Sequence, residues 1–382
     1  MDDGQFAAHG GQVPDHGGHS GQVPDHGGQV PDHGDHSGQF AAHGGQVPDH
    51  EEEAAAAGGG GRGPLSHRAS TVAAGEPEVG AFDPGEAGDE LGRSGFASVV
   101  GRPNVGKSTL VNRLVGVKVS ITSPRPNTTR RPTRGVLHAP GAQAVFVDTP
   151  GLHRPKTALG RRLNDHVAGA LADVDVVVAV VDATAAIGPG DRLVLQRAVA
   201  GRPAHQVLVA VNKVDAATPA QVLHQLSGAE AVVRQVLGAE HEVELFPVSA
   251  ATGLGVEPLA RAVLDRLPEG PAYFPNDMVS DTDATFWLAE LVREQLLRAT
   301  HDELPHAIAC RVVEQQWPRV RIEIVVERPS QRAIVIGHEG SVLKKVGTAV
   351  RAQLPPGAYV ELHVVVDAHW QQRPDAIEGF GY

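Results

Sequence analysis

Gly101-Arg-Pro-Asn-Val-Gly-Lys-Ser108 is the most informative segment of this chain. It has the spacing G-x-x-x-x-G-K-S and lies between the apolar run Phe96-Ala-Ser-Val-Val100 and the helix-like run Thr109-Leu-Val-Asn-Arg-Leu-Val115. A strand, a glycine-rich turn and a helix in this order bring backbone N–H groups together at the positive end of the helix, where a phosphate binds. A plain glycine turn between a strand and a helix is the alternative, and the flanking runs favour phosphate binding.

Two side chains of this stretch suit a bound polyphosphate. Lys107 would reach the outer phosphates, and the Ser108 hydroxyl would be a magnesium ligand. We expect the contacts to come from the stretch and the residue after it: Gly101, Asn104, Val105, Gly106, Lys107, Ser108 and Thr109. The stretch by itself does not identify the nucleotide.

Residues 1–92 have a composition unlike the rest of the chain. They hold 16 Asp and Glu against 2 Arg, a net charge of −14, and Gly-Gln-Val-Pro-Asp-His occurs in them four times. With so few apolar residues the segment cannot offset the entropy lost on folding, so we predict a disordered, low-complexity tail. Its histidines could chelate a soft divalent metal, but a solvated acidic linker is the interpretation that this composition favours.

The other residues carry little net charge. Residues 93–270 have a net charge of +6 and residues 271–382 one of −4, a balance that neither requires nor excludes an RNA partner. No stretch approaches the ~18 apolar residues of a membrane span. The single cysteine, Cys310, excludes an intramolecular disulfide and suits a reducing cytoplasm. Its apolar neighbours predict a core thiol rather than a nucleophile.

Apolar runs alternate with helical patterns over the middle of the chain. The expected strands are 96–100, 144–147, 174–181, 206–211 and 243–248, and the expected helices are 107–115, 159–171, 191–200, 219–237 and 256–267. Near-continuous runs of Val, Ala and Leu are typical of a parallel sheet covered on both faces. We therefore predict an α/β fold over residues 93–268, with a doubly wound, mostly parallel sheet and one phosphate loop.

A proline-rich linker is expected at residues 269–276, where it would hold two domains apart semi-rigidly. Residues 277–382 show a different order of elements. They contain a helix at 285–299, strands at 307–314 and 320–326, a short helix at 331–336, a glycine loop, a helix at 341–354 and a strand at 359–366. This order predicts a compact α+β domain that is too small for a second nucleotide fold.

Two further motifs could complete a magnesium site beside the phosphate loop. Thr128-Thr129-Arg130-Arg131 lies in a polar loop, and a threonine hydroxyl there can join the metal only when a γ-phosphate is present. Thr129 is the preferred ligand and Thr128 the alternative. Asp148-Thr-Pro-Gly151 ends a strand, so Asp148 can hold magnesium through water and the Gly151 N–H can sense the γ-phosphate. Taken singly, both motifs are also common in ordinary turns.

Asn212-Lys-Val-Asp215 indicates guanine as the base. The Asp215 carboxylate can accept hydrogen bonds from N1–H and the 2-amino group of guanine, and adenine offers no matching pair. Asn212 would brace the neighbouring loops, and Lys213 would lie along the base. Ser249-Ala250 would present the Ala250 N–H to the guanine O6. The motifs occur in order, each just beyond the carboxyl end of a strand, where such folds bind ligands. Together they predict GTP.

The motifs resemble those of the Era family of bacterial GTPases, in the translation-factor-related class. The nucleotide domain carries this likeness in Gly101–Ser108, Asp148-Thr-Pro-Gly-Leu152, Asn212–Asp215 and Ser249-Ala-Ala-Thr-Gly253. Beyond it, Val335-Ile-Gly-His-Glu-Gly-Ser-Val-Leu-Lys-Lys-Val-Gly347 resembles the G-x-x-G loop and following helix of a type II KH domain, and the ending from Trp370 to Tyr382 is also similar. The resemblance covers roughly residues 94–382.

This resemblance implies slow hydrolysis of GTP to GDP and phosphate. It also implies binding of the 3′ end of small-subunit ribosomal RNA during assembly of the small ribosomal subunit. Lys107, Thr129 and magnesium would supply most of the charge stabilisation in hydrolysis. RNA would bind at the Gly337–Gly340 loop, where glycines let the backbone approach phosphates while bases lie in a groove beside it. Lys344 and Lys345 would add charge directed at the RNA backbone.

Three features affect how this implied function would work. His338 and Glu339 form the centre of the G-x-x-G loop, where the family usually has a basic residue, so we expect fewer ionic contacts with RNA. Leu152 stands where a glutamine commonly orients the attacking water, which a leucine cannot do. Asn104 is then a candidate ligand for K⁺, an ion that would stand in for an arginine finger.

The resemblance is consistent with a cytoplasmic protein, and we expect a monomer. Peripheral association with the inner face of the cell membrane is attributed to the family, but no basic amphipathic helix supports it here. Two other functions compete. Leu152 leaves open a non-hydrolysing, GTP-liganded RNA-binding assembly scaffold, and the histidine-rich tail leaves open a metal-binding protein.

Overall fold

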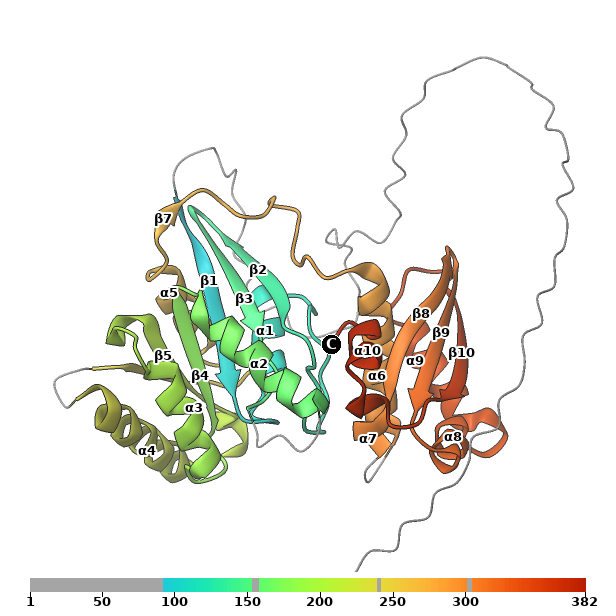
Figure 1. The fold of residues 1–382 in the computed structure, drawn as a ribbon. Coiled ribbons are helices and arrows are strands. Elements are labelled where there is room, and N and C mark those ends of the chain that lie inside the picture. The colour runs from blue at the N-terminus through green and yellow to red at the C-terminus, as the bar shows by residue number, and fades with distance from the viewer. Residues whose placement is uncertain (1–91, 153–157, 239–241, 301–303) are drawn as a thin grey trace, which may run out of the picture. The chain divides into compact units, whose positions relative to one another are not determined.

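The computed structural model describes residues 92–152, 158–238, 242–300 and 304–382. The predicted disordered tail therefore lies outside the described residues, except for Gly92. Within the described chain, seven strands form one sheet and three strands form another (Figure 1).

The larger sheet has the topology of a doubly wound fold. Its strands are β1 (Gly92–Gly101), β2 (Thr133–Ala139), β3 (Ala142–Asp148), β4 (Val176–Asp182), β5 (Val207–Asn212), β6 (Glu244–Pro247) and β7 (Glu269–Gly270). They are arranged in the order β2-β3-β1-β4-β5-β6, with β7 beside the start of β1. Strands β3, β1, β4, β5 and β6 are parallel, and β2 runs antiparallel to β3. The predicted mostly parallel sheet is confirmed.

Helices cover both faces of this sheet (Figure 1). One face packs against α1 (Lys107–Val115) and α5 (Val256–Leu264), and the other against α2 (Ala158–Ala172), α3 (Pro189–Val199) and α4 (Pro219–Leu237). Successive β4 residues enter opposite cores, since Val178 packs with the α1 side and Val177 with the α2 side. A strand buried on both faces needs an apolar side chain at every position, which explains the valine run.

Strand β2 was not expected from the sequence. It lies at the edge of the sheet and contains Arg134, Gly135 and His138, so no continuous apolar run marks it. Its antiparallel pairing with β3 is made through the tight connection at Pro140 and Gly141, where Gly141 has φ 66°.

Residues of the predicted linker make contacts with the larger sheet. Glu269 pairs with Arg93 of β1, and the ring of Tyr273 lies 5.0 Å from that of Phe96. Gln143 of β3 accepts hydrogen bonds from the N–H groups of Tyr273 and Phe274, at 2.7 and 3.0 Å. The limits given to the domains and the linker remain predictions.

The smaller domain is the expected α+β unit. Its elements are α6 (Ala284–Ala299), α7 (Leu304–Ala307), β8 (Ala309–Gln316), β9 (Arg319–Val326), α8 (Pro329–Ile336), α9 (Ser341–Arg351), β10 (Tyr359–Val366) and α10 (Pro374–Gly379). The sheet order is β10-β9-β8, with β10 parallel and β8 antiparallel to β9. Helices α6 and α9 share its core. The short helices α7 and α10 were not predicted.

Cys310 of β8 lies in this core, as expected. Its side chain is buried, and burial raises the pKa of the thiol to about 12. In the described part of the chain, no helix is both long enough and apolar enough to cross a membrane.

Candidate nucleotide and RNA sites

The Gly101–Ser108 loop connects β1 to α1, and close packing explains its glycines. A Cβ at Gly101 would lie 2.8 Å from the carbonyl oxygen of Val180. Gly106 has φ 97°, and a Cβ there would lie 2.3 Å from Nδ2 of Asn212. Helix α1 begins at Lys107, so the positive end of a helix dipole faces the loop. This is the geometry of an anion site.

Lys107 is buried in this loop. Its Nζ donates a 3.0 Å hydrogen bond to the carbonyl oxygen of Arg102. Burial lowers the pKa of Lys107 to about 8, an effect that the nearby Asp148 carboxylate opposes. A cation that is destabilised in this way gains more from a phosphate than an exposed lysine would.

Ser108, Thr129 and Asp148 come together beside the lysine. The Thr129 hydroxyl lies 2.9 Å from the Ser108 hydroxyl and donates to Oδ2 of Asp148 at 3.2 Å. Asp148 is fully buried, and burial raises its pKa although Lys107 opposes the rise. Its Oδ1 has no hydrogen-bond partner among the described residues. Three hard oxygen groups with one orphaned carboxylate oxygen fit a magnesium ion.

Thr128 does not join this group. Its hydroxyl donates to the carbonyl oxygen of Arg125 at 2.7 Å, within the loop. Of the two threonines that the sequence left as alternatives, the structure brings Thr129 to Ser108 and Asp148. Thr109 follows on α1, where it is partly buried.

Asn212 connects the phosphate loop to the Ser249–Ala250 loop. Its Nδ2 donates to the carbonyl oxygen of Val105 at 2.8 Å, and its Oδ1 accepts from the Ala250 N–H at 2.9 Å. These are the contacts expected of a brace. They also mean that the Ala250 N–H, which we expect to meet the guanine O6, donates to Asn212 in this structure.

Lys213 and Asp215 lie on the turn after β5. Lys213 has φ 69°, and its Nζ donates to Oδ2 of Asp182 at 2.6 Å, while Asp215 is exposed. Sequence reasoning missed Asp182, which ends β4. Burial raises the pKa of Asp182, but hydrogen bonds from Lys213 and Thr184 outweigh this, and the net shift is downward. The signal that could have identified Asp182 from the sequence was its position at the carboxyl end of a central strand.

The residues that follow Asp148 explain two features of the motif. A Cβ at Gly151 would lie 2.6 Å from the backbone nitrogen of Pro103, so a side chain there would displace the phosphate loop. The Leu152 side chain is buried in the core that α2, α3 and α4 share. Leu152 therefore serves packing. Ser249, also buried, accepts from the Thr252 N–H at 3.1 Å and shapes the last loop.

Asn104 lies at the outer edge of the phosphate loop. It has φ 65°, and its Nδ2 donates to the carbonyl oxygen of Pro124 at 2.9 Å. This bond connects the phosphate loop to the loop that carries Thr129. Potassium binding at Asn104 stays a prediction.

The glycine loop of the smaller domain joins α8 to α9. Gly337 and Gly340 have φ 74° and 77°, and Glu339 has φ 50°. His338 and Glu339 are exposed at its tip, and Lys344 and Lys345 are exposed on α9. The loop thus presents backbone to solvent, with an acidic side chain at its centre.

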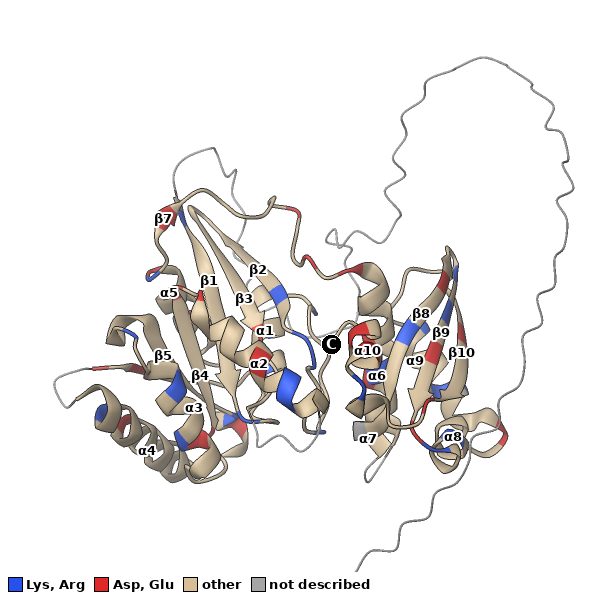
Figure 2. Ribbon diagram, viewed as in Figure 1, with Lys and Arg blue, Asp and Glu red and all other residues tan. Residues whose placement is uncertain are grey.

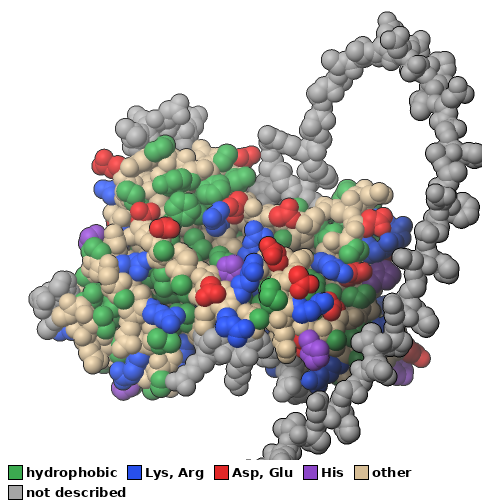
Figure 3. All heavy atoms as spheres, viewed as in Figure 1, with side chains coloured by type: hydrophobic (Ala, Val, Ile, Leu, Met, Phe, Trp, Pro, Cys, Tyr) green, Lys and Arg blue, Asp and Glu red, His purple; other side chains and the backbone are tan. Residues whose placement is uncertain are grey.

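Several basic side chains on the sheet of this domain are paired with acidic ones. Arg311 pairs with Glu323 at 2.7 Å, and Arg321 pairs with Glu314 at 2.9 Å. Figure 2 shows the two signs of charge interspersed along β8, β9 and β10, and the face in Figure 3 likewise mixes blue and red side chains. The expectation of fewer ionic contacts with RNA stays a prediction.

One edge of the parallel sheet carries a phosphate loop, a magnesium-ligand group and a guanine motif, and an α+β domain with a G-x-x-G loop follows. These features define a P-loop GTPase with a KH domain. Residues 96–213 match the 50S ribosome-binding GTPase family, and residues 303–371 match the KH domain family. GTPase Era of Mycobacterium avium is 43% identical over 302 residues, covering 76% of this chain and 99% of that protein. For GTPase Era of Mycobacterium tuberculosis strain H37Rv the identity is also 43%, over 98% of that protein. The chain belongs to the Era family of GTPases.

Solved structures of Era agree with this assignment. A variant of Aquifex aeolicus Era bound to GDP and AlF4⁻ superposes with a TM-score of 0.70 at 34% identity, covering 76% of this chain and 99% of that one. An Era complex with MgGDPNP and nucleotides 1506–1542 of 16S ribosomal RNA gives the same TM-score of 0.70, identity and coverage.

Proposed function

We propose that this chain is a GTP-hydrolysing switch that binds the 3′ end of small-subunit ribosomal RNA and acts in assembly of the small ribosomal subunit. The observation that carries the proposal is the meeting of Thr129, Ser108 and Asp148 beside the buried Lys107. The solved Era complex with a magnesium-bound GTP analogue and 16S RNA supports both the nucleotide part and the RNA part of this proposal.

In this proposal each site residue has a separate task. Ser108 and Thr129 would bind Mg²⁺ directly, and Asp148 would hold it through a water molecule. When bound, the ion supplies positive charge to the phosphates. Lys107 would bind the outer phosphates in a buried setting, where its attraction is strong. Gly151 would offer its N–H to the γ-phosphate, so that Thr129 and Gly151 respond to GTP and not to GDP.

We propose slow turnover, because the buried Leu152 cannot orient a water molecule. A potassium ion at Asn104 would supply part of the missing charge. If so, exchange of K⁺ for Na⁺ at constant ionic strength lowers turnover. Equal turnover in the two salts would remove this part of the proposal.

Guanine would be read by Asp215, with Asn212 fixing the loops around it. RNA would bind at the Gly337–Gly340 loop, through close approach of the backbone, and Lys344 and Lys345 would contact phosphates. We also propose a monomeric, cytoplasmic protein. Peripheral membrane association has only the family attribution in its favour.

A single-turnover experiment tests the hydrolysis. The purified full chain is mixed with a less than equimolar amount of labelled GTP and excess Mg²⁺, with and without an RNA of the small-subunit 3′ end. We expect phosphate release that the RNA changes, and none from Lys107→Ala. Tight GTP and RNA binding without phosphate release would favour the non-hydrolysing scaffold. A histidine-rich metal-binding role would need metal affinity in residues 1–92, which lie almost wholly outside the described residues.

A further inference from the structure

Thr128 and Arg130, the two residues that flank Thr129, both make hydrogen bonds with the KH domain. The carbonyl oxygen of Thr128, on one side, accepts a hydrogen bond from Nη2 of Arg293 on α6. Arg130, on the other side, donates from Nη1 to the carbonyl oxygen of Ile308 at 2.7 Å. Both neighbours of Thr129 therefore make hydrogen bonds to the same domain, Thr128 through its backbone carbonyl and Arg130 through its side chain.

Arg130 is enclosed by aromatic rings of the C-terminal segment. Its guanidinium carbon lies 5.4 Å from the ring centroid of Trp370 and 5.1 Å from that of Tyr382. All three side chains are buried. Attraction between a cation and an aromatic face is strongest where water is excluded, and the planar guanidinium suits such a cage. Burial lowers the pKa of Arg130, and Tyr382 and Glu290 oppose this.

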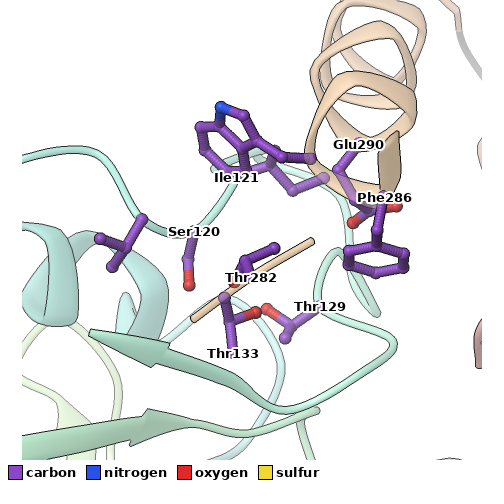
Figure 4. A pocket seen from close by; sticks show the side chains of 9 residues that line it. Ser120, Ile121, Thr129, Thr133, Thr282, Phe286 and Glu290 are labelled. Carbon is purple, nitrogen blue, oxygen red and sulfur yellow. The ribbon is translucent and has the colours of Figure 1, made fainter. Parts of the chain in front are cut away.

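The second anchor rests on a buried ion pair. Arg293 is fully buried and pairs with Glu290 through two bonds of 2.5 and 2.6 Å, while the Tyr382 hydroxyl lies 3.5 Å from Glu290. Figure 4 shows Thr129 facing the side of α6 that carries Phe286 and Glu290. The cavity that remains between them has a volume of about 10 Å³, at the lower limit for one water molecule.

A second segment of the nucleotide domain, helix α2, packs against the same aromatic rings. Leu159 and Leu163 of α2, the helix that follows the Asp148–Gly151 motif, are buried in one cluster with Trp370, Phe380 and Tyr382. The ring centroids of Trp370 and Phe380 lie 5.1 Å apart. One aromatic cluster of the KH domain therefore contacts two parts of the nucleotide domain. They are Arg130, which follows Thr129, and α2, the helix that follows the Asp148–Gly151 motif.

We propose that Arg130 is a positioning residue for GTP hydrolysis, which acts by holding Thr129 at the magnesium site from its cage in the KH domain. This inference rests on the proposed function, because it assumes that Thr129 binds magnesium only in the GTP state. Loss of the cage then weakens GTP binding and leaves GDP binding unchanged. The C-terminal rings are thus part of what makes the GTPase site respond to the γ-phosphate.

Two variants of the full chain test this role. Arg130→Ala removes the cation. Tyr382→Ala removes one of the aromatic rings that enclose this cation, and Tyr382 lies far outside the nucleotide domain in the sequence. Affinities for a non-hydrolysable GTP analogue and for GDP are measured with Mg²⁺, alongside a thermal melt. We expect each variant to lose roughly tenfold in affinity for the analogue, the scale of one charged hydrogen bond, with GDP affinity within twofold of the wild type. Arg130→Lys should recover only part of the loss, since lysine lacks the planar fork.

Arg134→Ala is the matched control. Arg134 follows on β2, is 52% exposed and pairs with Asp281 at 2.7 Å, so its removal should leave both affinities unchanged. Equal losses for the analogue and GDP, or no loss, would overturn the positioning role. Failure of the wild type to bind or hydrolyse GTP would instead overturn the proposed function itself, so the two failures are distinct.

Discussion

The hydroxyl of Thr129 lies 2.9 Å from the hydroxyl of Ser108, although 21 positions separate the two residues in the chain. The contact predicts different effects for the two neighbouring threonines. Thr129→Ala should lower GTP turnover by about 10²–10³-fold, because a group aimed at the transition-state charge is lost. Thr128→Ala removes one hydrogen bond to Arg125, and should cost about 1 kcal/mol of stability with near-normal turnover. Phosphate-release assays and thermal melts separate the two, and a reversed order would contradict this assignment.

The lowered pKa of Lys107 predicts that GTP binding takes up a proton in alkaline solution. The free lysine titrates near pH 8, and a bound phosphate favours the charged form and raises this pKa. Below pH 7 the lysine is charged in both states, and affinity should not vary with pH. Above pH 8 the free protein has lost the proton, so affinity should fall towards tenfold per pH unit.

Calorimetry in two buffers of different ionisation enthalpy would measure that proton at pH 8.5. Lys107→Met is the control, because it has no ammonium group to titrate. Proton uptake that persists in the variant would show that another group is responsible.

The proposed role of Asp215 predicts that its substitution changes which base the protein prefers. With Asp215→Asn the side-chain oxygen can still accept from N1–H, but the amide now donates where guanine has an amino group. Xanthine carries an oxygen there, so the variant should lose affinity for GTP and gain affinity for XTP. A loss of 10²-fold or more for GTP is expected from the unpaired polar groups. Competition binding of the two nucleotides measures this, and an unchanged ratio would argue against Asp215 as the base-reading residue.

The buried ion pair between Glu290 and Arg293 predicts that loss of the Glu290 charge destabilises the KH domain. Glu290→Gln would leave Arg293 buried without its counter-charge, which typically costs about 3–5 kcal/mol. Glu323→Gln is a matched control on β9, where the partner Arg311 is 49% exposed, and it should cost less than about 1 kcal/mol. Urea unfolding of the two variants compares these losses. Equal midpoints of the two variants would mean that the buried pair stabilises the domain no more than the exposed pair does.

The acidic G-x-x-G loop predicts a weak salt dependence of RNA binding. Glu339 is exposed at its tip, and Lys344 and Lys345 follow in the first turns of α9. Neutralising about two phosphates gives a slope of about −1.4 in log affinity against log salt for single-stranded RNA. Filter binding of the 3′-end RNA at several salt concentrations measures this slope. The matched test is Glu339→Lys, which should steepen it.

Much of the nucleotide domain could be predicted because its signals are local. Helices α1 and α4 have the predicted bounds, since each is an unbroken helical pattern with a marked beginning. The buried strands were recognisable because burial on both faces requires an apolar residue at every position. Strand β2 was missed because an edge strand carries no such run, and its pairing with β3 is a property of the sheet.

The class of fold, the order of the motifs and the identity of the groups that would meet phosphate and base can be read from the sequence, since each signal lies in residues close together in the chain. Tertiary packing brings Thr129 rather than Thr128 to Ser108, and it places Asn212 as the acceptor for the Ala250 N–H. It alone placed Arg130 between Trp370 and Tyr382. The cause is distance along the chain: an arginine in a polar loop is an ordinary exposed cation until rings more than two hundred residues away exclude water from it.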